Sequence, residues 1–74
     1  MRLSVWKDDP GYANWDGRRY DVFLDGKKQR AVFVADEETG EVICARYRPD
    51  GHLLIEGEEV ATQTLRGDVV IRLQ

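Results

Sequence analysis

The chain lacks most of the side chains from which metal sites and hydrolytic centres are built. It contains one cysteine, Cys44, and one histidine, His52. A metal site usually needs several His or Cys ligands, and a hydrolytic dyad needs a nucleophile and an orienting group around its histidine. The sequence offers no such set for His52, so we expect no enzymatic activity, no metal and no other cofactor. Cys44 lies in the apolar run Val42–Ala45, which predicts a buried, unreactive thiol in a reducing compartment.

Charge of one sign and long apolar runs are also scarce. The chain has 11 basic and 14 acidic residues, a formal net charge of −3, and the two signs are interleaved. A general phosphate-binding surface is therefore disfavoured. No apolar run approaches membrane-spanning length, and the segment from Met1 to Asp8 lacks the apolar core of a secretion signal. We expect a cytoplasmic protein with no membrane partner.

The sequence is rich instead in turn signals. Asp25-Gly26, Glu38-Thr39-Gly40 and Pro49-Asp50-Gly51 separate runs that are rich in Val, Ile, Phe and Tyr. This rhythm predicts a mainly β fold, an antiparallel meander of five or six strands curled into a small barrel or sandwich. A chain of 74 residues makes one domain, residues 1–74.

The turn signals also set the expected strand boundaries. The expected strands are Arg19 to Leu24, Lys27 to Ala35, Val42 to Tyr47, His52 to Glu56, Val60 to Leu65 and Asp68 to Leu73, and Leu3 to Trp6 could form a short first strand before them. Asp25-Gly26 should form a type I′ turn with Leu24 opposite Lys27, and Arg66-Gly67 should close a final hairpin. Asp36 is placed to accept backbone N–H bonds, and Gly40 is free to adopt a positive φ.

Following the expected pairs across the sheet divides the side chains between two faces. The predicted core consists of Tyr20, Val22, Phe33, Cys44, Leu53, Ile55 and Ile71. The other face carries a surplus of apolar side chains, namely Val32, Val34, Ile43, Ala45 and Tyr47. This surplus must be covered by curling of the sheet, by the segment from Trp6 to Trp15, or by another molecule. We therefore expect self-association, most simply as a homodimer.

Aromatic side chains are the best candidates for contact with a partner, because Trp and Tyr combine a large apolar area with a polar group. The expected partner-binding residues are Tyr12, Trp15, Tyr47, Arg46 and Arg48. They favour a non-enzymatic module that binds another protein. The alternative is a nucleic-acid-associated small β-barrel, which would use Tyr47 for stacking between two arginines. Trp15, like Trp6, could instead simply pack over the sheet.

The order of the turn motifs resembles that of small proteins encoded by tailed bacteriophages and prophages. The similarity follows Asp8-Asp9-Pro10-Gly11-Tyr12, then Val22-Phe23-Leu24-Asp25-Gly26, then the segment from Ala35 to Val42, and continues from Gly57 to Ile71. The resemblance carries over no functional residue. It implies a phage-type protein made in the bacterial cytoplasm, either an accessory factor or a minor virion component.

Overall fold

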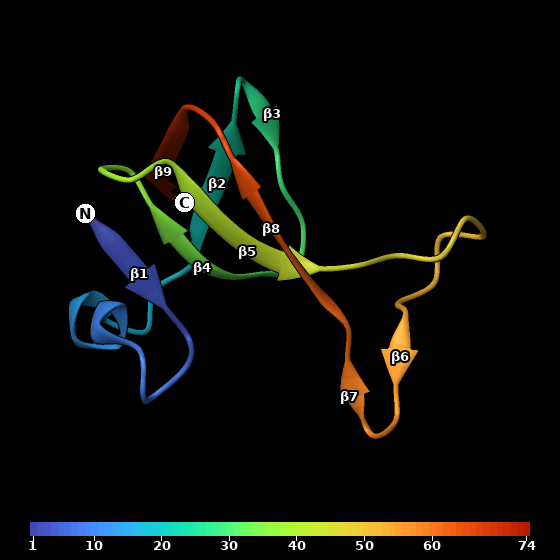
Figure 1. Cartoon of the computed structure of the whole chain (residues 1–74). Helices are drawn as coiled ribbons and strands as arrows, with labels where there is room; N and C mark the ends of the chain where they lie inside the picture. Colours follow the sequence, from blue (N-terminus) through green and yellow to red (C-terminus); the bar gives the residue numbers. More distant parts are fainter.

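The computed structural model describes every residue from Met1 to Gln74 (Figure 1). Its elements in chain order are β1 (Arg2–Ser4), the 3-10 helix η1 (Pro10–Asn14), β2 (Tyr20–Leu24), β3 (Lys27–Lys28), β4 (Val32–Asp36), β5 (Glu41–Ala45), β6 (Ile55–Glu56), β7 (Glu59–Val60), β8 (Thr62–Arg66) and β9 (Val69–Leu73). All paired strands are antiparallel. The predicted mainly β class is confirmed.

The nine strands form three sheets and no closed barrel, so the prediction of one meander of five or six strands is wrong, and so is its barrel alternative. One sheet has the order β1-β4-β5-β8, the second has the order β3-β2-β9, and β6 and β7 pair only with each other. The pairs β2-β3, β4-β5 and β6-β7 are hairpins between neighbours in the chain. The pairs β1-β4, β5-β8 and β2-β9 join strands that are distant in the sequence, and turn chemistry does not encode such pairs.

The β2-β3 hairpin forms as predicted but is much shorter than expected. Asp25 and Gly26 have φ angles of 49° and 82°, as a type I′ turn requires, and Leu24 lies opposite Lys27. The return strand ends at Lys28 rather than Ala35, and Ala31, three residues further on, adopts a φ of 51°. A residue in this region ends the extended run, and the chain then crosses to β4 in the other sheet.

The expected last hairpin is also replaced by a crossing between sheets. β8 pairs with β5 and β9 pairs with β2, so Arg66, Gly67 and Asp68 connect the two layers. Two earlier turns hold this connection in place. The Gly67 amide donates to the Gly40 carbonyl oxygen at 2.9 Å, and the Asp68 amide donates to the Asp25 carboxylate at 2.9 Å.

The main core lies between the two larger sheets. Its buried members are Val22, Ala35, Val42, Cys44 and Val69. Val22 and Cys44 were predicted to be in the core, and this is confirmed. Tyr20, Phe33 and Ile71 are only half-buried.

The core prediction is wrong for Leu53 and Ile55, which are 41% and 54% exposed. Leu53 and Ile55 are two residues apart and so have the spacing expected for one face of a strand. Their segment, however, leaves the two packed sheets, and no second sheet packs against it. A local pattern of apolar residues therefore cannot tell whether the strand that carries them reaches the core.

A β-bulge at Phe33 changes the faces predicted for β4. Val32 lies opposite Cys44 while Val34 lies opposite Ile43, so β4 contains one extra residue at this point. Val32 consequently packs against the core, and Phe33 stacks on Trp6 with ring centroids 5.6 Å apart. Val34 is completely buried.

The supposed surplus apolar face is therefore largely covered within the chain. Val34 and Ala45 are buried, and Val32 and Ile43 are half-buried. The segment after β1 supplies part of the packing in this region, through the stacking of Trp6 on Phe33. This face no longer supports self-association, and a homodimer needs a different interface.

Candidate functional site

An arm, residues 46–60, projects from the two packed sheets (Figure 1). It branches at a closed ring of three backbone hydrogen bonds. The Arg46 amide donates to the Ala61 carbonyl oxygen at 2.8 Å, the Ala61 amide donates to Leu54 at 2.8 Å, and the Leu54 amide donates to Arg46 at 2.9 Å. Because each of the three peptide units both donates and accepts, the base of the arm is fixed although the arm itself lies outside the sheets.

The arm consists of two short hairpin units beyond this ring. In the first, the Gly51 amide donates to the Arg48 carbonyl oxygen at 2.9 Å, as the predicted type I turn requires, and Tyr47 pairs with Leu53. In the second, β6 and β7 are joined by Gly57 and Glu58. Gly57 has a φ of 62°, the conformation that a type II′ turn needs at its first central residue.

Apolar side chains of the arm remain open to solvent. Tyr47 is 37% exposed and lies opposite Leu53, which is 41% exposed, and Ile55 is 54% exposed. The Arg30 guanidinium lies over the Tyr47 ring, 4.7 Å from its centroid, and so ties the base of the arm to the body. Tyr47, Leu53 and Ile55 thus give the arm a contact surface with both aliphatic and aromatic character.

The arginines on either side of Tyr47 are paired with carboxylates of the arm. Arg46 lies 3.9 Å from Glu56, and Arg48 lies 3.1 Å from Asp50. Each pair is well exposed and therefore weak. The pairing nevertheless reduces the positive charge that this part of the arm presents to a phosphate backbone.

A groove of about 610 Å³ is lined by residues of β1, β2 and β4, by the loop before β2, and by residues 28–31 between β3 and β4. Apolar side chains from both sheets line its interior, among them Val22, Val32 and Phe33. Its charged lining residues are Arg18, Arg19, Lys28, Arg30 and Asp21. The groove thus joins an apolar interior to a predominantly cationic rim.

The rim contains both paired and free cations. Arg18 lies 3.5 Å from Asp16, and Lys28 lies 3.2 Å from Asp21. Hydrogen bonds from Gln74 and Lys28 lower the pKa of Asp21, which keeps this carboxylate charged. Arg19 and Arg30 form no ion pair within the chain, so they are the cations that remain available to an acidic partner.

A neighbouring hydrogen-bond cluster fixes the loop that forms one end of the groove. The Arg18 amide donates to the Asp16 carboxylate at 3.0 Å and lowers its pKa, and the Tyr20 hydroxyl donates to the same oxygen at 3.1 Å. Burial and this bond raise the pKa of Tyr20. The Trp15 indole N–H donates to the Arg18 carbonyl oxygen at 2.9 Å.

The five predicted partner-binding residues do not form one site. Tyr12 and Trp15 contact each other edge to face near η1, with ring centroids 6.3 Å apart, and both are half-buried. Arg46, Tyr47 and Arg48 lie on the arm, where they are exposed. Trp15 is the one member of the first group that lines the groove.

Sequence reasoning missed the groove rim and the exposed part of the arm. The rim brings Arg18 and Arg19 next to Lys28 and Arg30 through the crossing at Ala31, which carries no glycine or proline signal. A usable signal did exist on the arm. Ile55 directly precedes the acidic turn from Glu56 to Glu59. Three of the four residues in this turn carry carboxylates, which are costly to bury, so Ile55 could have been predicted to lie near the surface.

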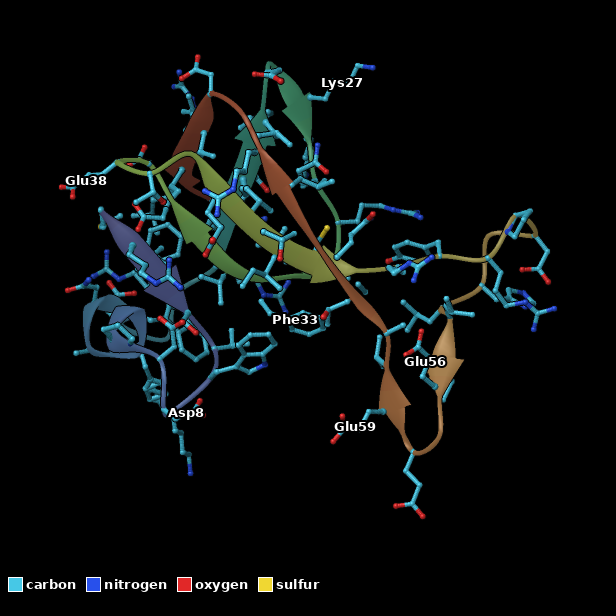
Figure 2. All side chains as sticks on the ribbon, in the orientation of Figure 1. Asp8, Lys27, Phe33, Glu38, Glu56 and Glu59 are labelled. Atoms are coloured by element: carbon cyan, nitrogen blue, oxygen red, sulfur yellow. The ribbon has the colours of Figure 1, made fainter.

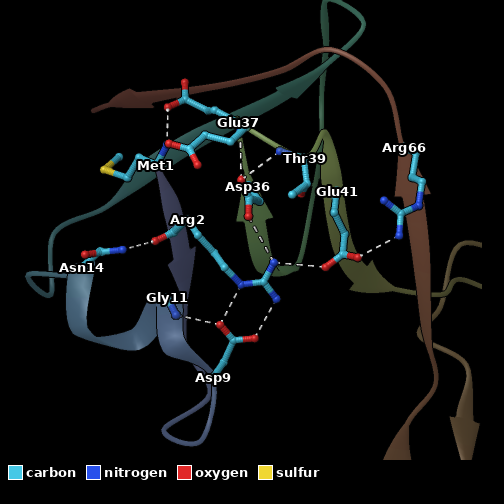
Figure 3. Close-up of polar contacts among 11 residues, drawn as sticks. Met1, Arg2, Asp9, Gly11, Asn14, Asp36, Glu37, Thr39, Glu41 and Arg66 are labelled. Carbon is cyan, nitrogen blue, oxygen red and sulfur yellow. Dashed lines mark hydrogen bonds and ion pairs between the residues drawn. The ribbon is translucent and has the colours of Figure 1, made fainter.

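Arg2 organises the N-terminal edge of the molecule (Figure 3). Its guanidinium donates two hydrogen bonds to Asp9, at 2.8 and 2.9 Å, and one to Glu41 at 3.2 Å. Arg66 donates to the other oxygen of Glu41 at 3.2 Å. The Asp9 carboxylate also accepts from the Gly11 amide at 2.8 Å. These bonds tie η1 to three strands of the larger sheet, so we assign them a structural role.

Asp36 has the role predicted for it in the turn between β4 and β5. Its carboxylate accepts from the Glu38 and Thr39 amides at 2.8 and 3.1 Å, and Gly40 has a φ of 75°. Burial opposes ionisation of Asp36, but these bonds and Arg2 outweigh it and lower the pKa.

The two side chains best suited to chemistry are far from any catalytic arrangement. The His52 side chain is 80% exposed, and its nearest carboxylate, that of Asp50, lies 3.9 Å away. Cys44 is buried, and burial raises the pKa of its thiol, which disfavours the nucleophilic thiolate. No three His, Cys, Asp or Glu side chains come together in a way that would hold a metal ion.

Comparisons with known proteins give no indication of function, so the arm and the groove are the features from which function is inferred. No protein-family model, curated protein or solved structure matches the chain. The structure contains no helix with the length and apolar character needed to cross a membrane.

Proposed function

We propose that this protein is a non-enzymatic protein-binding module whose arm contacts another protein. The observation that carries the proposal is the exposed apolar surface of Tyr47, Leu53 and Ile55 on a segment outside the two packed sheets. Aromatic and aliphatic side chains beside arginine are typical of interface centres. The ring of hydrogen bonds at Ala61 supports this role, because a fixed base reduces the entropy lost when the arm binds.

A phage-type accessory or virion protein in the bacterial cytoplasm remains our prediction for its biological setting. The motif order quoted above supports it. This setting is consistent with a small module whose role is to bind a host or phage protein.

The test is affinity capture from a nuclease-treated bacterial lysate with wild-type protein and two matched variants. Ile55→Ser alters the arm, and Leu73→Ser alters an equally exposed aliphatic residue at the end of β9, since the two are 54% and 52% exposed. We expect wild type and Leu73→Ser to retain a protein that Ile55→Ser loses. Equal retention by a folded Ile55→Ser variant would contradict the assignment of the arm.

The alternative function, association with nucleic acid, is less well supported. The paired states of Arg46 and Arg48 weaken the stacking arrangement expected around Tyr47. The cationic rim of the groove is the one feature that favours it. If a capture without nuclease recovers nucleic acid and the nuclease-treated capture recovers nothing, the alternative is correct.

A further inference from the structure

The β6-β7 hairpin carries unbalanced negative charge. Glu56 lies directly opposite Glu59, and Glu58 occupies the turn between them. Like charges at directly opposed positions destabilise a strand pair. The hairpin contains no cation, and the one ion pair that reaches it is the 3.9 Å contact between Arg46 and Glu56. Its tip is therefore electrostatically suited to a cationic surface.

The hairpin also lacks the packing that would hold it in isolation. Each of its strands is two residues long, and it pairs with no other strand. Two-stranded hairpins are marginally stable by themselves even when they are longer. Ile55, opposite Val60, remains more than half exposed. Figure 2 shows Glu56 and Glu59 on this hairpin, away from the packed sheets.

The groove has the complementary features. Four cationic side chains and one carboxylate line it, and its apolar interior reaches the core residues Val22 and Ala35. Arg19 and Arg30 have no carboxylate partner within the chain. The volume of about 610 Å³ is sufficient for a small group of side chains. An occupant with acidic ends and an apolar side would neutralise the rim and cover this open end of the core.

We infer that the β6-β7 hairpin of one copy docks into the groove of a second copy. The inference rests on the proposed function, because it uses the same arm, and it identifies a second copy as a partner. No ion pair joins the carboxylates of the hairpin to the groove cations within one copy. Reciprocal exchange of hairpins between two copies gives a closed two-fold dimer. The interface is thus different from the apolar face predicted from the sequence.

The inference is tested by sedimentation velocity of nuclease-treated protein over a range of concentrations. The arm variant carries Glu58→Lys and Glu59→Lys, and the groove variant carries Arg19→Glu and Arg30→Glu. A control variant, Lys7→Glu with Lys27→Glu, changes the net charge as the groove variant does but alters cations outside the groove. Far-UV circular dichroism checks that each variant is folded.

We expect wild type and the control variant to dimerise, and the arm and groove variants each to associate at least about tenfold more weakly. The decisive sample is an equimolar mixture of the arm and groove variants. Its two interfaces are both complementary, because the reversed hairpin meets the reversed groove and the remaining native hairpin meets the native groove. The mixture should therefore regain the dimer, and added salt should weaken it.

Several outcomes would overturn the inference. They are a wild-type protein that stays monomeric at its highest attainable concentration, a dimer unaffected by either reversal, and a mixture that fails to associate. Binding of a single-stranded oligonucleotide that the groove variant alone loses would assign the groove to nucleic acid instead. A monomeric wild type that still captures a protein through Ile55 would leave the proposed function intact, so the two failures are distinguishable.

Discussion

At the scale of single residues, Arg2 and Asp9 form a bidentate ion pair. A bidentate pair of this kind is both stronger and more directional than a single contact. The hydrogen bond from Arg2, with help from the Gly11 amide, lowers the pKa of Asp9 from 3.8 to about 2. The carboxylate therefore remains charged in the folded state at pH values where it is partly protonated in the unfolded state.

Asp9 should make the folded state sensitive to acid. Because the folded pKa is the lower one, its stabilisation is complete above about pH 4 and is lost as the pH falls towards 2. We expect Asp9→Asn to lower the free energy of unfolding at pH 7 and to flatten its decline between pH 4 and 2. Urea unfolding at a series of pH values measures this. The control is Asp8→Asn, which removes a carboxylate with no ion pair and should leave the fall in the free energy of unfolding between pH 4 and 2 as it is in wild type. If Asp9→Asn also leaves this fall unchanged, Asp9 is not the source of the acid sensitivity.

Gly40 is a second residue on which the structure depends. Its φ of 75° disfavours any side chain, and a Cβ there would lie 2.4 Å from the Gly67 carbonyl oxygen, on the connection between the sheets. Gly51 has a similar φ of 87° but open space around it. Gly51→Ala should therefore cost about 1–2 kcal/mol from backbone strain alone, and Gly40→Ala clearly more. Thermal unfolding measures the loss of stability in each variant. Equal losses in Gly40→Ala and Gly51→Ala would show that the close approach of Gly67 to Gly40 is unimportant.

At the scale of elements, burial separates strands that look alike in the sequence. Val42 on β5 is fully buried, whereas Ile55 on β6 is 54% exposed. We expect Val42→Ala to lower the free energy of unfolding by about 2 kcal/mol, because it removes buried methyl groups and leaves a cavity. At low protein concentration Ile55→Ala should change it by less than about 0.5 kcal/mol. A large loss in Ile55→Ala by urea unfolding would place β6 in the core after all.

The sequence predicted the local elements well and their partners poorly. Asp25-Gly26, Asp36 with Gly40, and the turn at Pro49 behave as their chemistry requires, because each depends on a few consecutive residues. The crossings at Ala31 and Gly67 depend instead on contacts with distant segments. The bulge at Phe33 shifts a face by one residue, which is enough to exchange inside and outside.

The same difference between local and long-range contacts explains which parts of the candidate site could be predicted from the sequence. Arg46, Tyr47 and Arg48 are adjacent in the chain, so a local signal was sufficient to single them out. The groove combines residues from Leu3 to Gln74 and exists only once both sheets have assembled. Its free cations, Arg19 and Arg30, were scattered among acidic residues in the sequence and became a common rim only through the fold.

At the scale of the whole molecule, stability is unevenly distributed. β4 and β5 are each paired on both sides, and Val34 in β4 and Val42 in β5 are fully buried. The arm pairs only within itself beyond the ring at Ala61. Local opening should therefore be easiest in the arm and hardest in the two central strands.

Amide hydrogen exchange tests this distribution and links it to the docking of the hairpin. In dilute protein we expect β4 and β5 to exchange most slowly, and residues 47–60 to exchange fastest, because their hydrogen bonds open without disturbing the core. As the concentration rises, amides of the β6-β7 hairpin should gain protection, since association stabilises the bound conformation by mass action. The arm variant should show the first pattern without the second. Slow exchange throughout the arm of a dilute monomer would contradict both expectations, because it would mean that the arm is stable without a partner.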